Sequence, residues 1–151
     1  MTATAATGSA GLVGLLLRPV PRSLPPTARV AAVGGIVVGA VLIALSSIIH
    51  LHLWMIGYKN IHIIGPAFLF QVISGLVLAV VLVAFRRLVL VVAGLLFCAG
   101  SVVALLLSAT VGLFGLHDGL DVPWAAPSLA IELAGLVVLT ACAGLMVRRS
   151  G

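Results

Sequence analysis

The chain has 151 residues, of which 63% are hydrophobic and 7% are charged, and its mean hydropathy is +1.39. A soluble domain could not cover so apolar a core with so little polar surface. The formal net charge is +5, but the arginines stand in short groups at the ends of apolar runs. This arrangement indicates membrane topology and argues against a nucleic-acid partner. We therefore expect an all-α integral membrane protein.

Residues 1–29 are predicted to form a basic cytoplasmic tail that is mostly disordered. Its first ten residues are small and polar, and four prolines between positions 19 and 26 prevent a continuous helix. The alternative is that the leucines of residues 11–17 lie on the membrane surface, against anionic lipid.

Four apolar runs follow, each long enough to cross a bilayer, since a spanning helix needs about 20 residues. We place them at about residues 30–50, 65–85, 88–113 and 128–147. Short loops join them into one four-helix transmembrane domain covering residues 30–149. A cleaved signal peptide ending near Ala44-Leu45-Ser46 is the competing interpretation of the first run. That run is long for a signal peptide, and three similar runs follow it, so we favour a span.

Small residues recur at helical spacing in the spans and predict close approach between helices. The positions that we expect at helix contacts are Gly35, Gly39, Gly75, Gly100, Ala104 and Ser108. In the second span, Gln71 and Ser74 are expected to be structural, with Gln71 bonding across helices. Cys98 and Cys142 are expected to be free apolar fillers, because their depths differ too much for a disulfide.

The positive-inside rule predicts the orientation of the spans. Lys59 lies in the loop between the first two spans. All the arginines fall on the other side: Arg18, Arg22, Arg29, Arg86, Arg87, Arg148 and Arg149. With four spans, we expect both termini to be cytoplasmic in a multi-pass protein of the plasma membrane. The excess of arginine over lysine, with Ala, Val, Leu and Gly dominant, is typical of a GC-rich bacterial genome.

Every histidine and every acidic residue falls at or near the outer rim of the spans: His50, His52, His62, His117, Asp118, Asp121 and Glu132. Imidazole and carboxylate groups bind zinc and copper. A transition-metal or haem site would therefore draw on His50, His52, His117 and Glu132. His50 and His52 can share a metal only if the first helix ends near His50, because residues two apart on a helix face roughly opposite ways. The alternative is that these side chains anchor the protein at the interface and bind no cofactor.

Glu132 lies about four residues inside the fourth span. A carboxyl group in hydrocarbon costs up to about 3 kcal/mol at the centre of a span. We therefore expect Glu132 to face the bundle and to meet a partner at similar depth, from among His50, His62, Gln71 and Ser46. The functional interpretation is a proton carrier or ligand, and the structural one is a glutamate that fixes the register of the helices.

The segment from His50 to Gln71 reads H-L-H-L-W-x-x-G-Y-x-x-I-x-x-I-G-P-x-F-L-x-Q. It resembles the signature stretch of a family of small four-span integral membrane proteins from actinobacteria. That family usually has proline where this chain has His62, so His62 is the histidine least tied to any shared role. The resemblance covers about 22 residues and the span layout. It implies a four-helix membrane protein and no particular activity.

The sequence contains no motif of nucleotide binding, zinc-protease chemistry or serine-hydrolase chemistry. We therefore favour a non-enzymatic accessory or scaffold protein, in contact with the bilayer and with other membrane proteins or further copies of itself. A metal- or haem-handling redox protein that uses the outer His/Glu cluster is one alternative. A small transporter subunit is the other, although four unbroken spans rarely enclose a path within a monomer.

Overall fold

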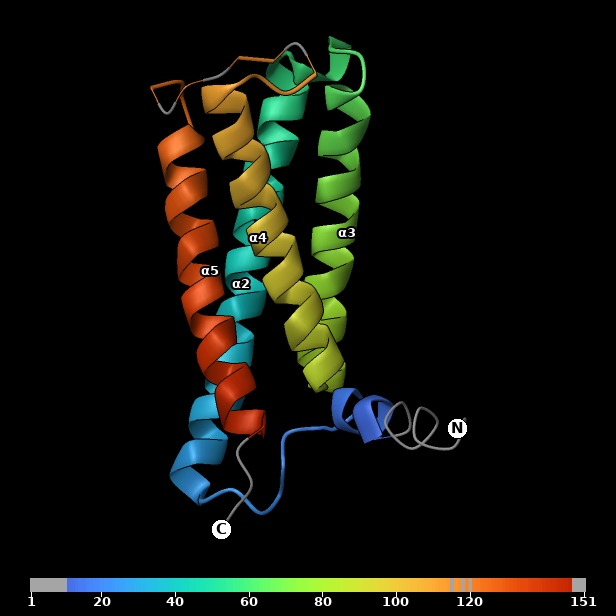
Figure 1. Ribbon diagram of the computed structural model, residues 1–151, viewed down its shortest axis with the longest axis vertical. Coiled ribbons are helices and arrows are strands. Elements are labelled where there is room, and N and C mark those ends of the chain that lie inside the picture. Colours follow the sequence, from blue (N-terminus) through green and yellow to red (C-terminus); the bar gives the residue numbers. More distant parts are fainter. Residues whose placement is uncertain (1–10, 115, 118, 120, 148–151) are drawn as a thin grey trace, which may run out of the picture.

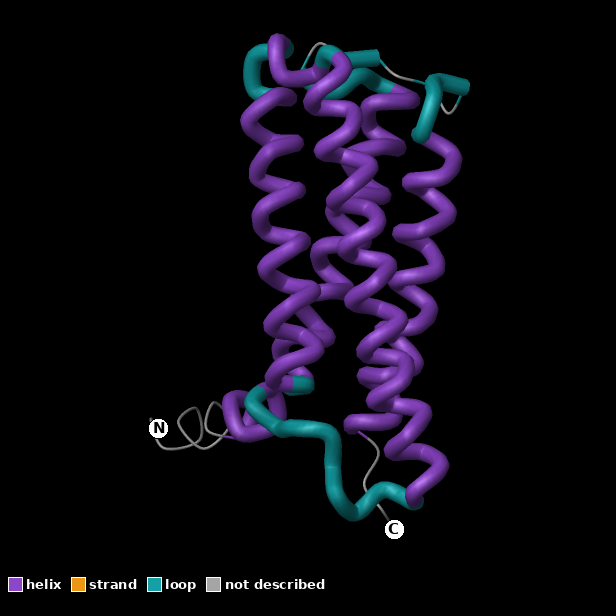
Figure 2. Tube along the Cα trace, turned by 180° about the vertical axis from the view of Figure 1, so that it is seen from behind, coloured by secondary structure: helices purple, strands orange, loops and turns teal. Residues whose placement is uncertain are grey.

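The computed structural model describes residues 11–114, 116–117, 119 and 121–147. Within these ranges, four helices are long and apolar enough to cross a membrane: α2 (Pro26–Ile56), α3 (Ile64–Phe85), α4 (Leu88–Thr110) and α5 (Ala125–Val147). They run up and down in one elongated bundle (Figure 1 and Figure 2). The all-α, four-helix prediction is confirmed. The expected disorder of residues 1–10 and the positions of Asp118, Arg148 and Arg149 lie outside the described residues.

The first spanning helix, α2, extends beyond the predicted span at both ends and has 31 residues. Pro26 occupies its first position, where the missing N–H costs no hydrogen bond. The helix continues past His50 and ends at Ile56, with Gly57 as its C-cap. His50 and His52 therefore lie on one continuous helix and face different ways.

The helices are packed unevenly around α2. It lies along both α3 and α5, and α5 also lies along α4. In contrast, α3 and α4 make few contacts with each other, even though a connection of only two residues, Arg86 and Arg87, joins them. Figure 1 shows α3 and α4 close together near this turn and farther apart toward the opposite end. This divergence makes room inside one half of the bundle.

Close packing surrounds Leu139 of α5, which is fully buried. A Cβ atom added to Gly39 of α2 would lie 2.5 Å from Leu139 Cδ2, and one added to Gly94 of α4 would lie 2.9 Å from Leu139 Cδ1. Glycine at both positions therefore lets three helices close around one leucine. Cys98 and Cys142 are buried and free, as predicted.

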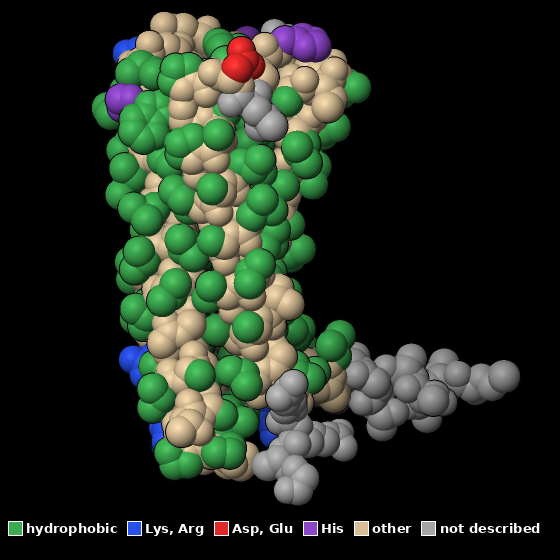
Figure 3. All heavy atoms as spheres, turned by 90° about the vertical axis from the view of Figure 1, so that its left-hand side faces the viewer, with side chains coloured by type: hydrophobic (Ala, Val, Ile, Leu, Met, Phe, Trp, Pro, Cys, Tyr) green, Lys and Arg blue, Asp and Glu red, His purple; other side chains and the backbone are tan. Residues whose placement is uncertain are grey.

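Large apolar side chains also cover the outside of the bundle. Phe70, Val80, Leu96 and Val137 are between 69% and 72% exposed. On the face drawn in Figure 3, hydrophobic side chains cover the length of the bundle and charged side chains gather at its two ends. Such a surface suits a hydrocarbon solvent, and the fold is that of a multi-pass membrane protein.

The two ends of the bundle differ in charge. The basic end holds the start of α2 and the α3–α4 turn, with Arg18, Arg22, Arg29, Arg86 and Arg87. The histidine end holds the α2–α3 and α4–α5 loops, with His62, His117 and Lys59.

The segment before α2 differs from the disordered tail that the sequence predicts. Residues 11–16 are helical, and the Leu88 N–H donates to the Arg18 carbonyl at 3.0 Å. Pro21 is buried, and Val20 packs against the core. Proline prevents one continuous helix here, but it does not prevent the chain from docking on the α3–α4 turn.

Candidate functional site

The buried carboxyl group of Glu132 is the centre of the candidate site. The residue is 1% exposed, and its Oε1 accepts hydrogen bonds from three serine hydroxyls. Ser128 of α5 donates at 3.1 Å, Ser46 of α2 at 2.9 Å and Ser101 of α4 at 2.5 Å. One oxygen thus links three helices. The structure places Glu132 inside the bundle and against Ser46, one of the four partners expected from the sequence.

The second carboxyl oxygen is bonded differently. Glu132 Oε2 is buried, and no described residue offers it a hydrogen bond. The same holds for Gln71 Nε2 on α3, so this nitrogen forms no hydrogen bond across helices with a described residue. An unpaired buried polar atom costs about 1–3 kcal/mol, and such atoms are rare in native proteins. An acceptor and a donor are therefore both open to a further partner.

Both groups line one cavity of about 200 Å³ in the half of the bundle nearer the histidine end. A single buried water needs only about 10–15 Å³, so the cavity has room for a small organic molecule. All four spanning helices contribute to the walls, as does the α4–α5 loop. Most of the lining is apolar, and the polar lining residues are His50, Tyr58, Gln71, Ser101, Ser108, Ser128 and Glu132.

The α4–α5 loop brings two aromatic side chains, Phe114 and Trp124, to the cavity lining. Both have a left-handed backbone, with φ of 50° and 73°. This conformation costs a non-glycine residue roughly 1–2 kcal/mol. Strained backbone of this kind persists where surrounding contacts hold it, and it is found mainly at functional sites.

His50 also lines the cavity. Its Nδ1 lies 2.8 Å from the Ser46 carbonyl oxygen. A carbonyl only accepts, so Nδ1 carries a proton and donates it, and in the neutral ring Nε2 is an acceptor. The ring contacts Phe68, with ring centroids 5.0 Å apart, and Tyr58 also stacks on Phe68. An aromatic group of three therefore forms part of the cavity wall.

The metal candidates are only partly brought together. His50 and Glu132 share the cavity, whereas His52 lies edge-on to Trp124 at 5.4 Å and is exposed. His62 and His117 are also exposed. No three His, Cys, Asp or Glu side chains in the described ranges form a group that could hold a metal ion. The condition for a shared His50–His52 metal, a helix ending near His50, is not met because α2 continues to Ile56.

Three of the glycines expected at helix contacts lie against neighbouring helices. Gly35 and Gly39 face α5, where an added Cβ atom would collide with the side chains of Cys142 and Leu139 respectively. A Cβ atom on Gly75 of α3 would collide with Ser47 Oγ of α2 and would lie 2.6 Å from an atom of the Phe97 ring. Helix backbones approach closely at each of these positions.

The small-residue stripe of α4 differs from its prediction. A Cβ atom added to Gly100 would meet nothing within 4 Å. Gly100, Ala104 and Ser108 all line the cavity, and Ser108 donates to the Leu116 carbonyl at 3.3 Å. The stripe leaves space because α3 diverges from α4 at this level.

Sequence reasoning missed two of the three serines that hold Glu132. Ser128 precedes Glu132 by four residues, which puts both on one helix face, so a signal was present. Ser101 lies on another helix, and nothing in its local sequence points to Glu132. Ser74, in contrast, donates to the Phe70 carbonyl of its own helix at 2.6 Å and takes no part in the site.

Comparison of the chain with protein-family models, with curated proteins and with solved structures finds no match. The resemblance of residues 50–71 to an actinobacterial family therefore stays an expectation. The class of the protein rests on its own fold and site. It is a multi-pass helical membrane protein with a polar group buried in a mainly apolar cavity.

Proposed function

We propose that the protein is a non-enzymatic accessory protein of a bacterial plasma membrane, and that its cavity binds a small amphiphilic molecule. The observation that carries this proposal is the open Glu132 Oε2 in a mainly apolar cavity. Glu132 Oε2 can accept a hydrogen bond from a donor, and Gln71 Nε2 requires an acceptor. A hydroxyl group is both, so the ligand class is an apolar molecule that ends in an alcohol.

The serines support this assignment because they fix the carboxyl group. Three donors on Oε1 hold the group from three helices, so Oε2 cannot turn toward them without breaking several hydrogen bonds. The binding group is therefore oriented before the ligand arrives, which lowers the entropic cost of binding.

The arrangement of charge supports a cytoplasmic position for both termini. The described arginines lie at the basic end, and Lys59 lies at the opposite end. The positive-inside rule then assigns the basic end to the cytoplasm and the cavity to the outer half of the membrane. In this orientation, an amphiphile in the outer leaflet has the shorter route to the cavity.

Quenching of Trp124 fluorescence tests the proposal directly. The chain has two tryptophans, so a Trp54→Phe background leaves only Trp124, which lines the cavity. We expect bromohexanol to quench Trp124 saturably in detergent, because bromine enters the cavity with the alcohol. Bromohexane, which has no hydroxyl group, should quench only by partitioning, without saturation.

Two variants complete the test. Glu132→Leu should weaken saturable quenching about tenfold or more, since the hydrogen bond to the carboxyl group is lost. Val137→Ala, on the same helix but 70% exposed and outside the cavity, should leave it unchanged. Equal, non-saturable quenching by both bromine compounds would show that the cavity does not select an alcohol.

A further inference from the structure

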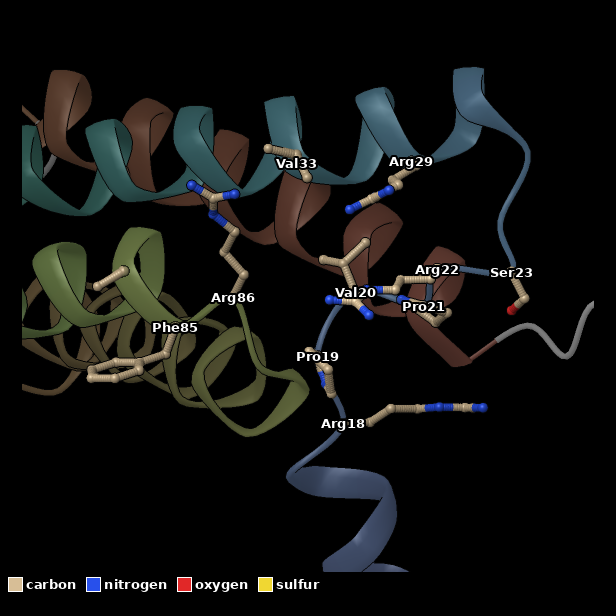
Figure 4. A pocket seen from close by; sticks show the side chains of 11 residues that line it. Arg18, Pro19, Val20, Pro21, Arg22, Ser23, Arg29, Val33, Phe85 and Arg86 are labelled. Carbon is tan, nitrogen blue, oxygen red and sulfur yellow. The ribbon is translucent and has the colours of Figure 1, made fainter.

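A second pocket, of about 740 Å³, lies at the basic end. It is bounded by the start of α2, the end of α3 and residues 18–23. Four arginines line it: Arg18, Arg22, Arg29 and Arg86. In Figure 4, Arg86 reaches toward α2, and Arg29 points from α2 toward the segment that holds Val20 and Arg22. Three separate parts of the fold thus contribute arginines to the lining of one pocket.

The residues that line this pocket provide no negative charge to balance its arginines. None of the residues that line it is acidic. The three acidic residues of the chain all follow position 117 in the sequence. Of these, Glu132 lies in the cavity described above, and Asp121 lies in the α4–α5 loop. Like charges gathered in this way repel one another, so an anion bound among them is favoured.

The pocket is held in shape by bonds within the protein. The Leu88 N–H donates a hydrogen bond to the Arg18 carbonyl at 3.0 Å. This bond ties the pocket wall formed by residues 18–23 to the α3–α4 turn. Arg86 Nε donates to the Val83 carbonyl at 3.0 Å, which orients that guanidinium and leaves its terminal nitrogens available. A guanidinium presents its N–H groups as a planar fork that fits phosphate.

Apolar surface adjoins the arginines. Val33, Ala84 and Phe85 complete the pocket lining, and Phe85, which is 60% exposed, points away from Arg86 (Figure 4). The neighbouring outer surface of α2 is also apolar, with Val30 72% exposed and Val37 41% exposed. A ligand with an anionic head and apolar chains therefore matches both parts, whereas a free anion matches only the arginines.

We propose that this pocket binds the phosphodiester headgroup of an anionic phospholipid, with the acyl chains lying along α2 and α3. The phosphate oxygens accept hydrogen bonds from the arginines, and the bound lipid joins the segment before α2 to the bundle. This site is independent of the amphiphile cavity, because the two share no residue.

Native mass spectrometry of the detergent-purified protein distinguishes the sources of phosphate. The probes are dioctanoyl-phosphatidylglycerol, dioctanoyl-phosphatidylcholine and glycerol phosphate. We expect phosphatidylglycerol to bind at least about tenfold more tightly than the zwitterionic lipid, since several arginines act on one net negative charge. Glycerol phosphate should bind far more weakly than either lipid. Equal binding of the two lipids, or tight binding of glycerol phosphate, would overturn the proposal.

Charge-matched variants locate the site. Arg22→Gln and Arg29→Gln should each weaken phosphatidylglycerol binding about fivefold, with phosphatidylcholine binding retained as evidence of folding. Arg87→Gln is the matched control, because Arg87 lies at the same turn as Arg86 but does not line the pocket. If Arg87→Gln weakens binding as much as the pocket variants do, the lipid responds to general surface charge and the assignment fails.

Discussion

Serine hydroxyls from three helices donate hydrogen bonds to one oxygen of Glu132 and so offset the free-energy cost of burying its carboxyl group. Elsewhere in the bundle, such hydroxyls bond back to their own helix: Ser47 donates to the Ile43 carbonyl at 2.9 Å, and Thr110 donates to the Leu106 carbonyl at 2.7 Å. That back-bond is the usual arrangement for a serine inside a helix. Ser46, Ser101 and Ser128 therefore have a ready alternative if the carboxyl group is removed.

Glu132→Leu should leave the fold intact for this reason. Leucine is at home in a span, and the three serines can turn to carbonyls of their own helices as Ser47 does. We expect the thermal midpoint in detergent to stay within a few degrees of the wild type. Unfolding of Glu132→Leu would show that the carboxyl group is required for the structure and was not retained for binding.

Removing serines while the carboxyl group stays should have the opposite effect. A Ser46→Ala/Ser101→Ala double variant leaves Glu132 Oε1 with one of its three donors. We expect a loss of about 1–3 kcal/mol in unfolding free energy, at about 0.6–1.7 kcal/mol for each hydrogen bond between helices. Ser47→Ala is the control, since Ser47 is equally buried but bonds its own helix. Equal stability of the double variant and the wild type would contradict the structural role of these bonds.

The helices themselves could be predicted from the lengths of the apolar runs, because bilayer thickness sets how many residues a span needs. Their ends could not, since local backbone conformation decides them. Helix α4 ends at Thr110, before Gly112 adopts a φ of +82°. At the other extreme, α2 continues through His52 and Trp54 because interfacial side chains are compatible with a helix.

The spacing of small residues was likewise only a partial guide to which helices pack closely together. It identified Gly39, which α5 approaches closely, and also Gly100, where an added Cβ atom would meet nothing within 4 Å. A small residue permits close contact, but the tilt of the facing helix decides whether contact occurs. That tilt depends on the whole bundle. The inward position of Glu132, in contrast, followed from the cost of a carboxyl group in hydrocarbon, which holds in any bundle.

A pair of leucine substitutions separates these two kinds of small residue. Gly39→Leu should destabilise the bundle by about 1–3 kcal/mol or more, because its Cβ atom would already lie 2.5 Å from Leu139 Cδ2. Ala104→Leu projects into the cavity wall, so it should keep the wild-type thermal midpoint and abolish saturable quenching of Trp124. Thermal unfolding measures the stability of both variants, and the bromohexanol titration measures whether Ala104→Leu still binds the alcohol. If Ala104→Leu unfolds as Gly39→Leu does, the α4 stripe packs against a neighbour after all.

On the scale of the molecule, the two pockets lie toward opposite ends of the same bundle. The cavity with Glu132 is lined in part by the α4–α5 loop at the histidine end, and the arginine pocket adjoins the α3–α4 turn at the basic end. The tightly packed region around Leu139, Gly39 and Gly94 lies on the helices that join them. The orientation of the bundle therefore decides which leaflet each pocket meets.

Topology reporters test that orientation. A reporter fused after Arg149 and one fused after Arg87 should both be active in the cytoplasm, because four and two spans precede these positions and the arginines stay inside. A reporter inserted after Asn60, beside Lys59, should be active outside. The Arg87 fusion is the internal control, since it has only α2 and α3 before it. If both arginine fusions were active outside the cell and the Asn60 reporter were active in the cytoplasm, the bundle would have the opposite orientation. The arginine pocket would then meet the outer leaflet, where the negative potential of the cytoplasmic leaflet does not act.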